Sequence, residues 1–279
     1  MKQLRRFFPL FVMPTLIAFI IAFVVPFIMG IYLSFTEFTT VSDAQFVGLK
    51  NYAAVLSGAD GFGRSFVFTV LFTIVTVISV NIIAFLLALA LTRGLKLTNL
   101  FRTVFFLPNL IGGIVLGYIW QLIFNGILQP FSKTLTSDSV YGFIGLVVMT
   151  NWQLIGYMMV IYISAINNVP HEQLEAATVD GAGSFMTLKK IILPGVWPSV
   201  TICTFLTLTN SFKLFDQNLA LTAGAPARKT EMLALNIYNT FYGRMGYEGI
   251  GQAKAVIFFV IVAAVALAQL YFTSKGESD

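Results

Sequence analysis

The chain has 279 residues, of which 57% are hydrophobic and 10% charged, and its mean hydropathy is +0.85. A soluble protein carries about a quarter charged residues, so this chain lacks the side chains that a water-facing surface needs and is expected to lie in a membrane. Its net charge of +5 comes from Lys and Arg scattered among apolar runs, which favours contact with membrane lipid and excludes nucleic acid as a partner.

The chain begins with Met-Lys-Gln-Leu-Arg-Arg and continues in an apolar run from Phe7 to about Leu33. A cleaved signal peptide has an apolar stretch of about 7–15 residues and a small-residue cleavage site. This run is longer and has no Ala-x-Ala site. We therefore expect an uncleaved first span whose basic end lies in the cytoplasm.

Six segments are apolar and long enough to cross the hydrocarbon, which takes about 20 helical residues. Many of their residues are Phe or β-branched, which by propensity alone would also suit a strand. A segment in lipid must satisfy its backbone hydrogen bonds internally, so we predict helices. The sequence therefore predicts an all-α integral membrane protein. Its predicted transmembrane helices are Phe8–Tyr32, Phe66–Leu91, Val104–Phe124, Tyr141–Ile166, Trp197–Leu221 and Gly251–Phe272.

Basic residues near the span ends indicate the orientation, with both termini in the cytoplasm. The outer loops are basic too, so the bias is modest. The inner set is Lys2, Arg5, Arg6, Arg93, Lys96, Arg102, Lys189, Lys190 and Lys275, and the outer set is Lys50, Arg64, Lys133, Arg228, Lys229 and Arg244. The expected organisation is a first span with its outer loop (1–64), a main transmembrane domain (65–272) and a short cytoplasmic tail (273–279).

The third span carries a Gly113-x-x-x-Gly117 pair, which we interpret as a helix-packing face. In the fourth span, the polar residues Asn151, Trp152 and Gln153 lie roughly 15–18 Å from its start, near the middle of the membrane.

The cytoplasmic loop 168–194 holds two short predicted helices. Asn168 can cap the first, with Pro170 in its first turn. Gly181 and Gly183 then break it. Ser184 can start the second, which is expected to end with Lys189 and Lys190 before Pro194.

One face of the first loop helix is made of small residues, because Leu174, Ala177, Thr178 and Gly181 are spaced i, i+3, i+4 and i+7. Small side chains allow another protein's backbone to approach closely, and Glu175 offers a charged contact for an arginine. We interpret the loop as a rigid docking element. The alternative, an amphipathic helix lying on the membrane, fits less well because the face is rich in alanine and weakly basic.

In the fifth span, Asn210, Lys213, Asp216 and Gln217 share one helical face. Lys213 lies roughly 24 Å from the start of the span, near the outer surface, so it can snorkel to water or pair with Asp216. Contact with a transported molecule or a delivering protein is the alternative interpretation. Asn210 lies deeper and is the better pathway candidate.

His171 is the only histidine and Cys203 the only cysteine, which excludes an internal disulfide and leaves too few ligands for a zinc site. His171-Glu172-Gln-Leu-Glu175 lacks the second histidine of a zinc-protease helix. No Gly-Lys dipeptide occurs, so a phosphate-binding Gly-x-x-x-x-Gly-Lys loop is excluded. We therefore predict no catalytic residue and no metal in this chain.

The residues Glu175-Ala176-Ala177, Gly181, Ile191 and Leu193-Pro194 resemble the EAA loop of binding-protein-dependent ABC importer permeases, including the nine residues between Gly181 and Ile191. Trp152, Gly156 and Met159 resemble the span that precedes this loop in the family. The segments 212–216 and 221–226 are similar to the maltose and multiple-sugar branch, although Ala225 stands where that branch usually has glycine. The resemblance covers about residues 65–272.

This resemblance implies the ABC type-1 transmembrane fold in a bacterial plasma membrane and import of a sugar or oligosaccharide. The implied partners are a second permease subunit, two ABC ATPase subunits and an extracytoplasmic solute-binding protein. The chain itself would bind no cofactor, because ATP and Mg would lie on the ATPase. Glu175 would contact a basic residue of the ATPase, and Gly181 would form the turn.

Under this implication, Asn151, Trp152, Gln153, Asn210, Lys213 and Asp216 are candidates for the substrate pathway, where amides bind sugar hydroxyls and an indole stacks on a pyranose. The fourth-span amides are equally suited to joining helices. Other cargoes, such as amino acid, phosphate or glycerol phosphate, stay open. A secondary transporter is disfavoured because the spans carry no carboxylate at mid-depth. The sequence does not name the sugar or say which permease binds it.

Overall fold

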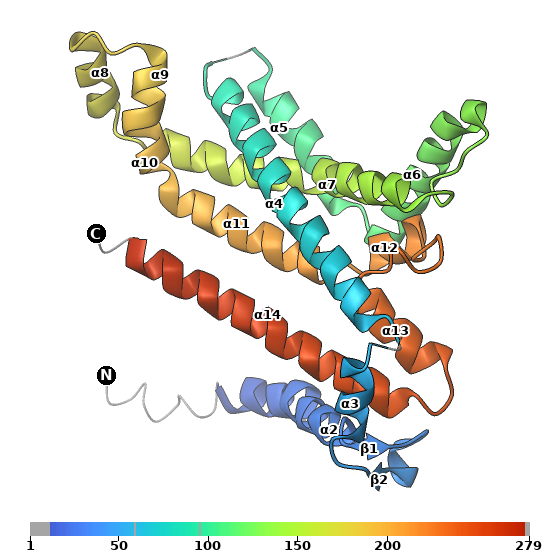
Figure 1. Cartoon of the computed structure of the whole chain (residues 1–279). Coiled ribbons are helices and arrows are strands. Elements are labelled where there is room, and N and C mark those ends of the chain that lie inside the picture. The colour runs from blue at the N-terminus through green and yellow to red at the C-terminus, as the bar shows by residue number, and fades with distance from the viewer. Residues whose placement is uncertain (1–11, 59, 95, 277–279) are drawn as a thin grey trace, which may run out of the picture. The chain divides into compact units, whose positions relative to one another are not determined.

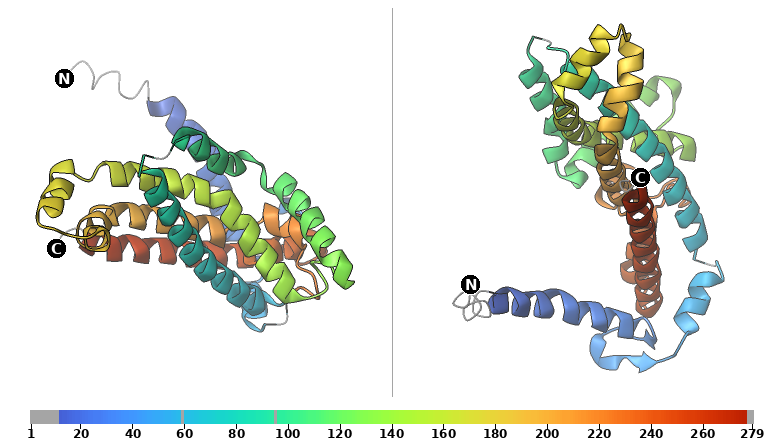
Figure 2. Two further views of the ribbon diagram at one scale, coloured as in Figure 1. Left: turned by 90° about the horizontal axis from the view of Figure 1, so that it is seen from above. Right: turned by 90° about the vertical axis from the view of Figure 1, so that its left-hand side faces the viewer.

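The computed structural model describes residues 12–58, 60–94 and 96–276, which form two compact units (Figures 1 and 2). Unit 1 is built from the chain up to residue 63 together with 236–261, and unit 2 from 64–235 with the chain from 262 onward. Lys2, Arg5 and Arg6, which contribute to the predicted orientation, lie outside the described residues, as do residues 277–279 of the predicted tail and the side chain of Lys275.

The first span of unit 1 is helical from Val12 to Leu33. It contains a π-helical stretch, η1 (Ile20–Val24), followed by α2 (Val25–Leu33). α2 meets the last helix, α14 (Glu248–Gly276), where Phe27 packs edge-on against Phe259 with ring centroids 4.9 Å apart. Close approach at this junction requires Gly30, because a Cβ there would press on the amide of Gln252.

After the first span, unit 1 forms a small folded segment. The strands β1 (Thr36–Glu37) and β2 (Gln45–Phe46) pair antiparallel, with Thr36 opposite Phe46, and are joined by the 3₁₀ turn η2 (Val41–Asp43). The Asp43 carboxylate accepts hydrogen bonds from the backbone N–H groups of Thr40 and Thr39, both at 2.9 Å, and these bonds lower the pKa of Asp43. Helix α3 (Lys50–Leu56) follows.

The other part of unit 1 is the corner between α13 (Leu233–Gly243) and α14. Lys254 on α14 is fully buried there, and its Nζ donates to Asn236 Oδ1 at 2.9 Å and to Thr240 Oγ1 at 2.8 Å. Arg244 forms an ion pair with Asp60 at 2.7 Å. These contacts fix α13 to the start of α14 and to the chain before α4.

Unit 2 contains the remaining helical elements, among which α4, α6, α7 and α11 are long and apolar. α4 and α7 are the longest, and α8 and α9 project from the ends of α7 and α11 (Figure 1). The elements are α4 (Phe62–Leu91), α5 (Thr98–Phe106), η3 (Leu107–Leu110), α6 (Gly113–Leu128), η4 (Gln129–Phe131), α7 (Ser139–Asn167), α8 (His171–Val179), α9 (Ser184–Thr187), η5 (Leu188–Ile192), α10 (Leu193–Gly195), α11 (Trp197–Phe212) and α12 (Asp216–Leu221).

Among the described residues, five helices are long and apolar enough to cross a membrane. A sixth crossing arises if Ser184–Gly195 and Trp197–Phe212, which meet at 66°, count as one bent span. This agrees with the six predicted spans. The second, fourth and sixth spans begin two to four residues earlier than predicted, and α14 continues to Gly276.

The third span was predicted to start at Val104, and this is wrong. Val104 belongs to α5, and the chain then passes through η3 and an extended residue, Ile111, before α6 starts at Gly113. Pro108 and Gly112 account for the break, because proline favours the first turn of a new helix and glycine weakens a continuous one. A search for long apolar stretches in the sequence does not detect such an interruption.

The fifth span is also discontinuous, which corrects the predicted helix Trp197–Leu221. α11 ends at Phe212, Lys213–Phe215 leave the helical path, and α12 restarts at Asp216. α12 packs on α6, where Gly113 and Gly117 provide the space: a Cβ on Gly117 would lie 2.6 Å from the Ala220 Cβ. The predicted packing role of the glycine pair is confirmed, with α12 as the neighbour.

The core of unit 2 has two apolar clusters, which we call the Tyr162 cluster and the Phe72 cluster. The first contains Val80, Ala84, Ala88, Leu91, Leu154, Met158, Met159, Tyr162, Ile163 and Cys203. The second contains Phe72, Leu116, Leu135, Leu146, Met149, Leu214, Leu221 and Met232. Helices α4 and α7 contribute to both, so they form the frame of the unit.

Candidate docking hairpin and polar pocket

The loop 168–194 contains a helical hairpin, α8–α9, whose turn is built by Gly181. Its φ of +74° is a left-handed conformation that glycine adopts without strain. The N–H of Ala182 donates to Ala177 O at 2.9 Å, and the N–H of Gly181 donates to Thr178 O at 3.1 Å. This pair of bonds is a Schellman motif. The predicted role of Gly181 in the turn is therefore confirmed.

The ends of the two hairpin helices differ from the prediction. Asn168 caps the C-terminus of α7, and Pro170 takes the N-cap position of α8. An extended Pro170 suits this position, because it makes no demand for a backbone N–H. Ser184 does start the second helix, as predicted.

The second helix was predicted to end before Pro194, and this is wrong. It continues through the π-helical turn η5 and through α10, where Leu193 N bonds to Leu188 O, until the bend at Val196. A proline cannot donate to the fourth residue before it, and the wider π turn accommodates its ring. Lys189 and Lys190 therefore lie inside a continuous helical arm.

The surface of the hairpin is open. Glu175, Ala176, Gly181, Leu193 and Pro194 are exposed, whereas Ala177 and Ile191 are half-buried. Three further apolar side chains that the sequence analysis missed are also exposed: Val179 (87%), Phe185 (77%) and Met186. Their signal in the sequence was apolar residues within an otherwise polar loop. Exposed apolar side chains of this size beside an acidic one are typical of a protein-docking surface.

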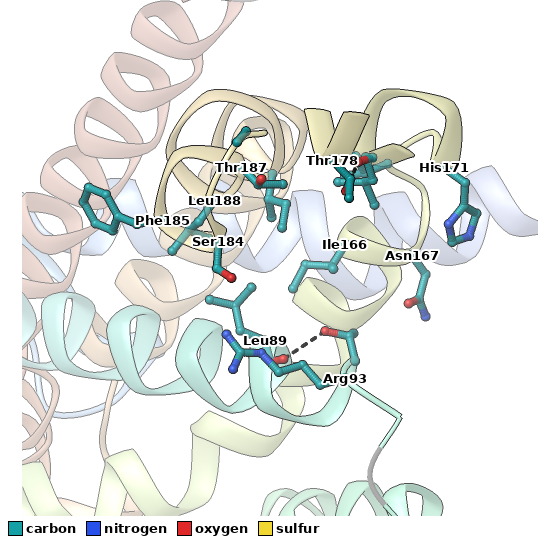
Figure 3. A pocket seen from close by; sticks show the side chains of 15 residues that line it. Leu89, Arg93, Ile166, Asn167, His171, Thr178, Ser184, Phe185, Thr187 and Leu188 are labelled. Atoms are coloured by element: carbon teal, nitrogen blue, oxygen red, sulfur yellow. Dashed lines mark hydrogen bonds between the residues drawn. The ribbon is translucent and has the colours of Figure 1, made fainter. Parts of the chain in front are cut away.

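Between the hairpin and the spans lies an open cavity of about 740 Å³, lined by residues of α8 and α9 and of the ends of α4 and α7 (Figure 3). Figure 3 shows His171 and Asn167 at one end and Phe185 at the other, with Arg93 below. The lining residues Leu174, Thr178 and Leu188 come from the inner faces of the hairpin helices. The hairpin therefore stands away from the spans, joined to them at its two ends.

A second cavity of about 420 Å³ lies between η3, α7 and the break after α11. We call it the polar pocket. It brings together four of the predicted pathway residues, Gln153, Asn210, Lys213 and Asp216, with others that the sequence analysis did not propose for the pathway. The full lining is Asn109, Thr150, Gln153, Leu154, Tyr157, Asn210, Lys213, Leu214, Phe215, Asp216 and Gln217.

The amides of the polar pocket hold its walls together. Gln217 Nε2 donates to Gln153 Oε1 at 2.9 Å, and Gln153 Nε2 donates to the backbone oxygen of Ile111 at 3.4 Å. Lys213 and Asp216 are exposed, and in the described part of the chain no ion pair joins them. The expected pairing of these two charges is therefore not formed.

Asn151 and Trp152 do not line the polar pocket. Asn151 is buried, and its Nδ2 donates to Val147 O at 2.8 Å within α7. Trp152 is 43% exposed and packs against Trp120 with ring centroids 5.5 Å apart. Their place on a substrate pathway stays a prediction. Asn81 accepts a hydrogen bond of 2.6 Å from the Tyr162 hydroxyl, which joins α4 to α7.

Residues 81–275 match a known protein family, described as the inner membrane component of binding-protein-dependent transport systems. The match contains the hairpin and the polar pocket. The chain belongs to this family. It is therefore a multi-pass permease subunit of the inner membrane and not an enzyme.

Two relatives resemble this permease over nearly their whole length. The probable starch degradation products transport system permease protein of Thermoanaerobacterium thermosulfurigenes is 44% identical, covering 97% of this chain and 94% of the relative. The multiple sugar-binding transport system permease protein of Streptococcus mutans is 29% identical, covering 96% and 95%. A subunit of a bacterial ABC transporter involved in alginate import has the same fold, with a TM-score of 0.83, 18% identity and 98% of each chain covered.

Proposed function

We propose that this permease imports a sugar or short oligosaccharide in an ATP-driven complex. In this proposal a binding protein delivers the sugar outside, a second permease completes the pathway, and two ATPase subunits carry ATP and Mg. The α8–α9 hairpin and both termini lie in the cytoplasm. The observation that carries the proposal is the exposed hairpin, rigidly turned at Gly181, in a chain of a transport family whose relatives are named for sugars.

The hairpin suits the transmission of force from an ATPase. Glu175 offers a carboxylate for a charge-assisted hydrogen bond, and Val179 and Phe185 offer apolar contact. One end of the hairpin continues helically toward α11, which borders the polar pocket. Movement of the docked hairpin would therefore reach the pocket, provided that the ATPase binds the two states of the permease with different free energies.

The polar pocket suits a neutral sugar. Four amides, from Asn109, Gln153, Asn210 and Gln217, supply donors and acceptors, with a volume of about 420 Å³ that lies in the range of small-molecule sites. The cationic Lys213 and the anionic Asp216 balance each other in charge. A strongly anionic cargo such as glycerol phosphate would meet the carboxylate of Asp216 as well as the ammonium of Lys213.

To test the docking role, the permease is reconstituted with its partner subunits, and Glu175→Gln and Gly181→Val are compared with Glu172→Gln. Glu172 is an exposed carboxylate in the first turn of the same helix, so its variant controls for charge. We expect the first two variants to lose most of the ATP hydrolysis that loaded binding protein stimulates, and the control to keep it. Wild-type stimulation of ATP hydrolysis in Glu175→Gln and in Gly181→Val would contradict the docking role.

To test the cargo, the complex is reconstituted in liposomes, and uptake of labelled glucose oligosaccharides is compared with uptake of labelled glycerol phosphate. Asn210→Ala is expected to reduce sugar uptake at least several-fold, whereas Gln129→Ala, an amide outside the polar pocket, is not. Uptake of glycerol phosphate alone would overturn the sugar assignment but leave the docking role intact. Unchanged uptake by Asn210→Ala would remove that residue from the pathway.

A further inference from the structure

Among the described residues of unit 2, five buried oxygen atoms on the long helices α4, α7 and α11 have no hydrogen-bond partner. They come from three helices: Thr73 Oγ1 and Thr76 Oγ1 on α4, Thr150 Oγ1 and Asn151 Oδ1 on α7, and Ser211 Oγ on α11. Buried polar side-chain atoms are nearly always hydrogen-bonded in proteins, and an unsatisfied one is costly in hydrocarbon. Each of these five therefore requires a physical explanation.

Along their helices, these residues lie between positions that belong to different apolar clusters. On α4, Thr73 and Thr76 lie between Phe72 of the Phe72 cluster and Val80 of the Tyr162 cluster. On α7, Thr150 and Asn151 lie between Met149 of the Phe72 cluster and Leu154 of the Tyr162 cluster. The unsatisfied groups therefore separate the two apolar clusters.

α11 repeats the pattern. Ser211 lies between Cys203 of the Tyr162 cluster and Leu214 of the Phe72 cluster. On each of the three helices, the unsatisfied oxygens thus occur where the helix passes from one apolar cluster to the other. We call these five residues the polar belt.

Other hydroxyls on these helices differ from those of the polar belt in their hydrogen bonds. Thr207 on α11 donates to Cys203 O at 2.7 Å, and Thr69 on α4 donates to Ser65 O at 2.7 Å. Both satisfy their hydroxyl within their own helix, which is the usual solution for threonine in a membrane span. The belt hydroxyls make no such bond in the structure, so their partner must come from outside their own helices.

We propose that the polar belt binds ordered water that bridges α4, α7 and α11. A buried water makes about three hydrogen bonds to otherwise unsatisfied groups, and the belt supplies five such atoms. The belt contains no carboxylate, thiolate or imidazole, so its neutral oxygens suit water better than a divalent cation. The site would replace direct side-chain contacts between three spans by hydrogen bonds through water.

The polar belt and the polar pocket are linked by their residues. Thr150 belongs to both, and Asn210, which lines the pocket, directly precedes Ser211 of the belt. The belt thus shares Thr150 with the polar pocket and has Ser211 next to a pocket residue in the sequence. This inference does not depend on sugar as the cargo, because it concerns only the state of the buried oxygens.

The sign of a stability change tests the proposal. In the purified complex, Thr76→Val and Thr150→Val are compared with Thr207→Val, in which the replaced hydroxyl is also fully buried but bonded within its helix. A hydroxyl that binds water loses real hydrogen bonds on replacement, whereas a dry, unsatisfied hydroxyl is better replaced by the methyl of valine. We expect both belt variants to melt several degrees below the control. Equal or higher melting temperatures would overturn the proposal.

A second measurement needs no variant and therefore does not depend on folding. Radiolysis of bound water labels the side chains next to it, so Met149, which directly precedes Thr150, is expected to be labelled at least several-fold faster than Met158 inside the Tyr162 cluster. Both methionines are fully buried, so exposure does not distinguish them. Labelling of Met149 no faster than that of Met158 would contradict water in the belt.

Discussion

At the residue scale, the features that the sequence made predictable are those that depend on local chemistry. Gly181 was predicted to break the first loop helix and, from the family resemblance, to form the turn, and its φ of +74° agrees with this. The polar residues Gln153, Asn210, Lys213 and Asp216 were recognised as unusual in apolar spans, and they meet in the polar pocket. Thr150 and Asn109 were missed, because the sequence analysis treated them only as parts of the predicted apolar spans that contain them.

Gly156 gives a prediction at this scale. It lies on α7, where a Cβ would overlap the carbonyl oxygen of Phe105 on α5, so α5 approaches α7 only because the side chain is absent. Gly156→Ala should therefore lower the free energy of unfolding by about 1–3 kcal/mol. Gly126→Ala on α6 is the matched control, since no atom lies within 4 Å of its added Cβ.

Thermal melting of the purified complex in detergent measures this difference. The control should be neutral or slightly stabilising, because alanine is the better helix former by up to about 1 kcal/mol. If Gly156→Ala and Gly126→Ala have the same melting temperature, the close approach of α5 to α7 does not require a glycine at position 156.

At the element scale, hydropathy located the spans but not their interruptions. The breaks at Pro108–Gly112 and Lys213–Phe215, and the π turn before Pro194, each depend on how one or two residues meet a neighbouring helix. α12 leaves the line of α11 and packs on the glycine face of α6. Such contacts are tertiary, and a single sequence read by local rules does not contain them.

The α13–α14 corner gives a prediction for elements. Lys254 is a fully buried cation whose Nζ bonds Asn236 and Thr240. Lys254→Met keeps the length of the side chain but deprives these two groups of a donor, so we expect a loss of about 1–3 kcal/mol in stability. Lys229→Met, at an exposed lysine, should change stability by less than about 0.5 kcal/mol.

Limited proteolysis between α13 and α14 reports on this corner directly. Faster cleavage of Lys254→Met than of Lys229→Met, under conditions where the rest of the chain stays intact, is the expected result. Equal cleavage rates and melting temperatures would show that Lys254 does not hold the two helices together.

At the scale of the whole molecule, composition indicated a membrane protein. The resemblance of the loop residues from Glu175 to Pro194 to a known motif indicated the family, which the family match confirmed. The partner-binding surface is less visible in the sequence. Val179 and Phe185 count as ordinary apolar residues until the structure shows them exposed on the hairpin. Their exposure is the observation on which the proposed docking role of the hairpin depends.

This exposure gives a third prediction. The double variant Val179→Ser and Phe185→Ser should reduce co-purification of the ATPase several-fold while leaving the chain in the membrane, because apolar contact at the hairpin is lost. Val41→Ser replaces an exposed apolar residue of unit 1, outside the hairpin, and controls for a general surface effect. The measurement is the amount of ATPase recovered with a tagged permease.

Undiminished recovery of the ATPase with the double variant would place its contact elsewhere. A matching loss with Val41→Ser would show that the effect is not specific to the hairpin.

The interruption of the fifth span at Lys213–Phe215 has a consequence for selectivity. Where a helix stops, main-chain carbonyl and amide groups lose their regular partners and turn toward whatever lies beside them. Beside this interruption lies the polar pocket. Under the proposed function, part of what a transported molecule meets there is peptide backbone, which the exchange of one side chain for another leaves in place. Mutation of single side chains should therefore reshape the preference of the importer more readily than abolish its recognition of hydroxylated cargo.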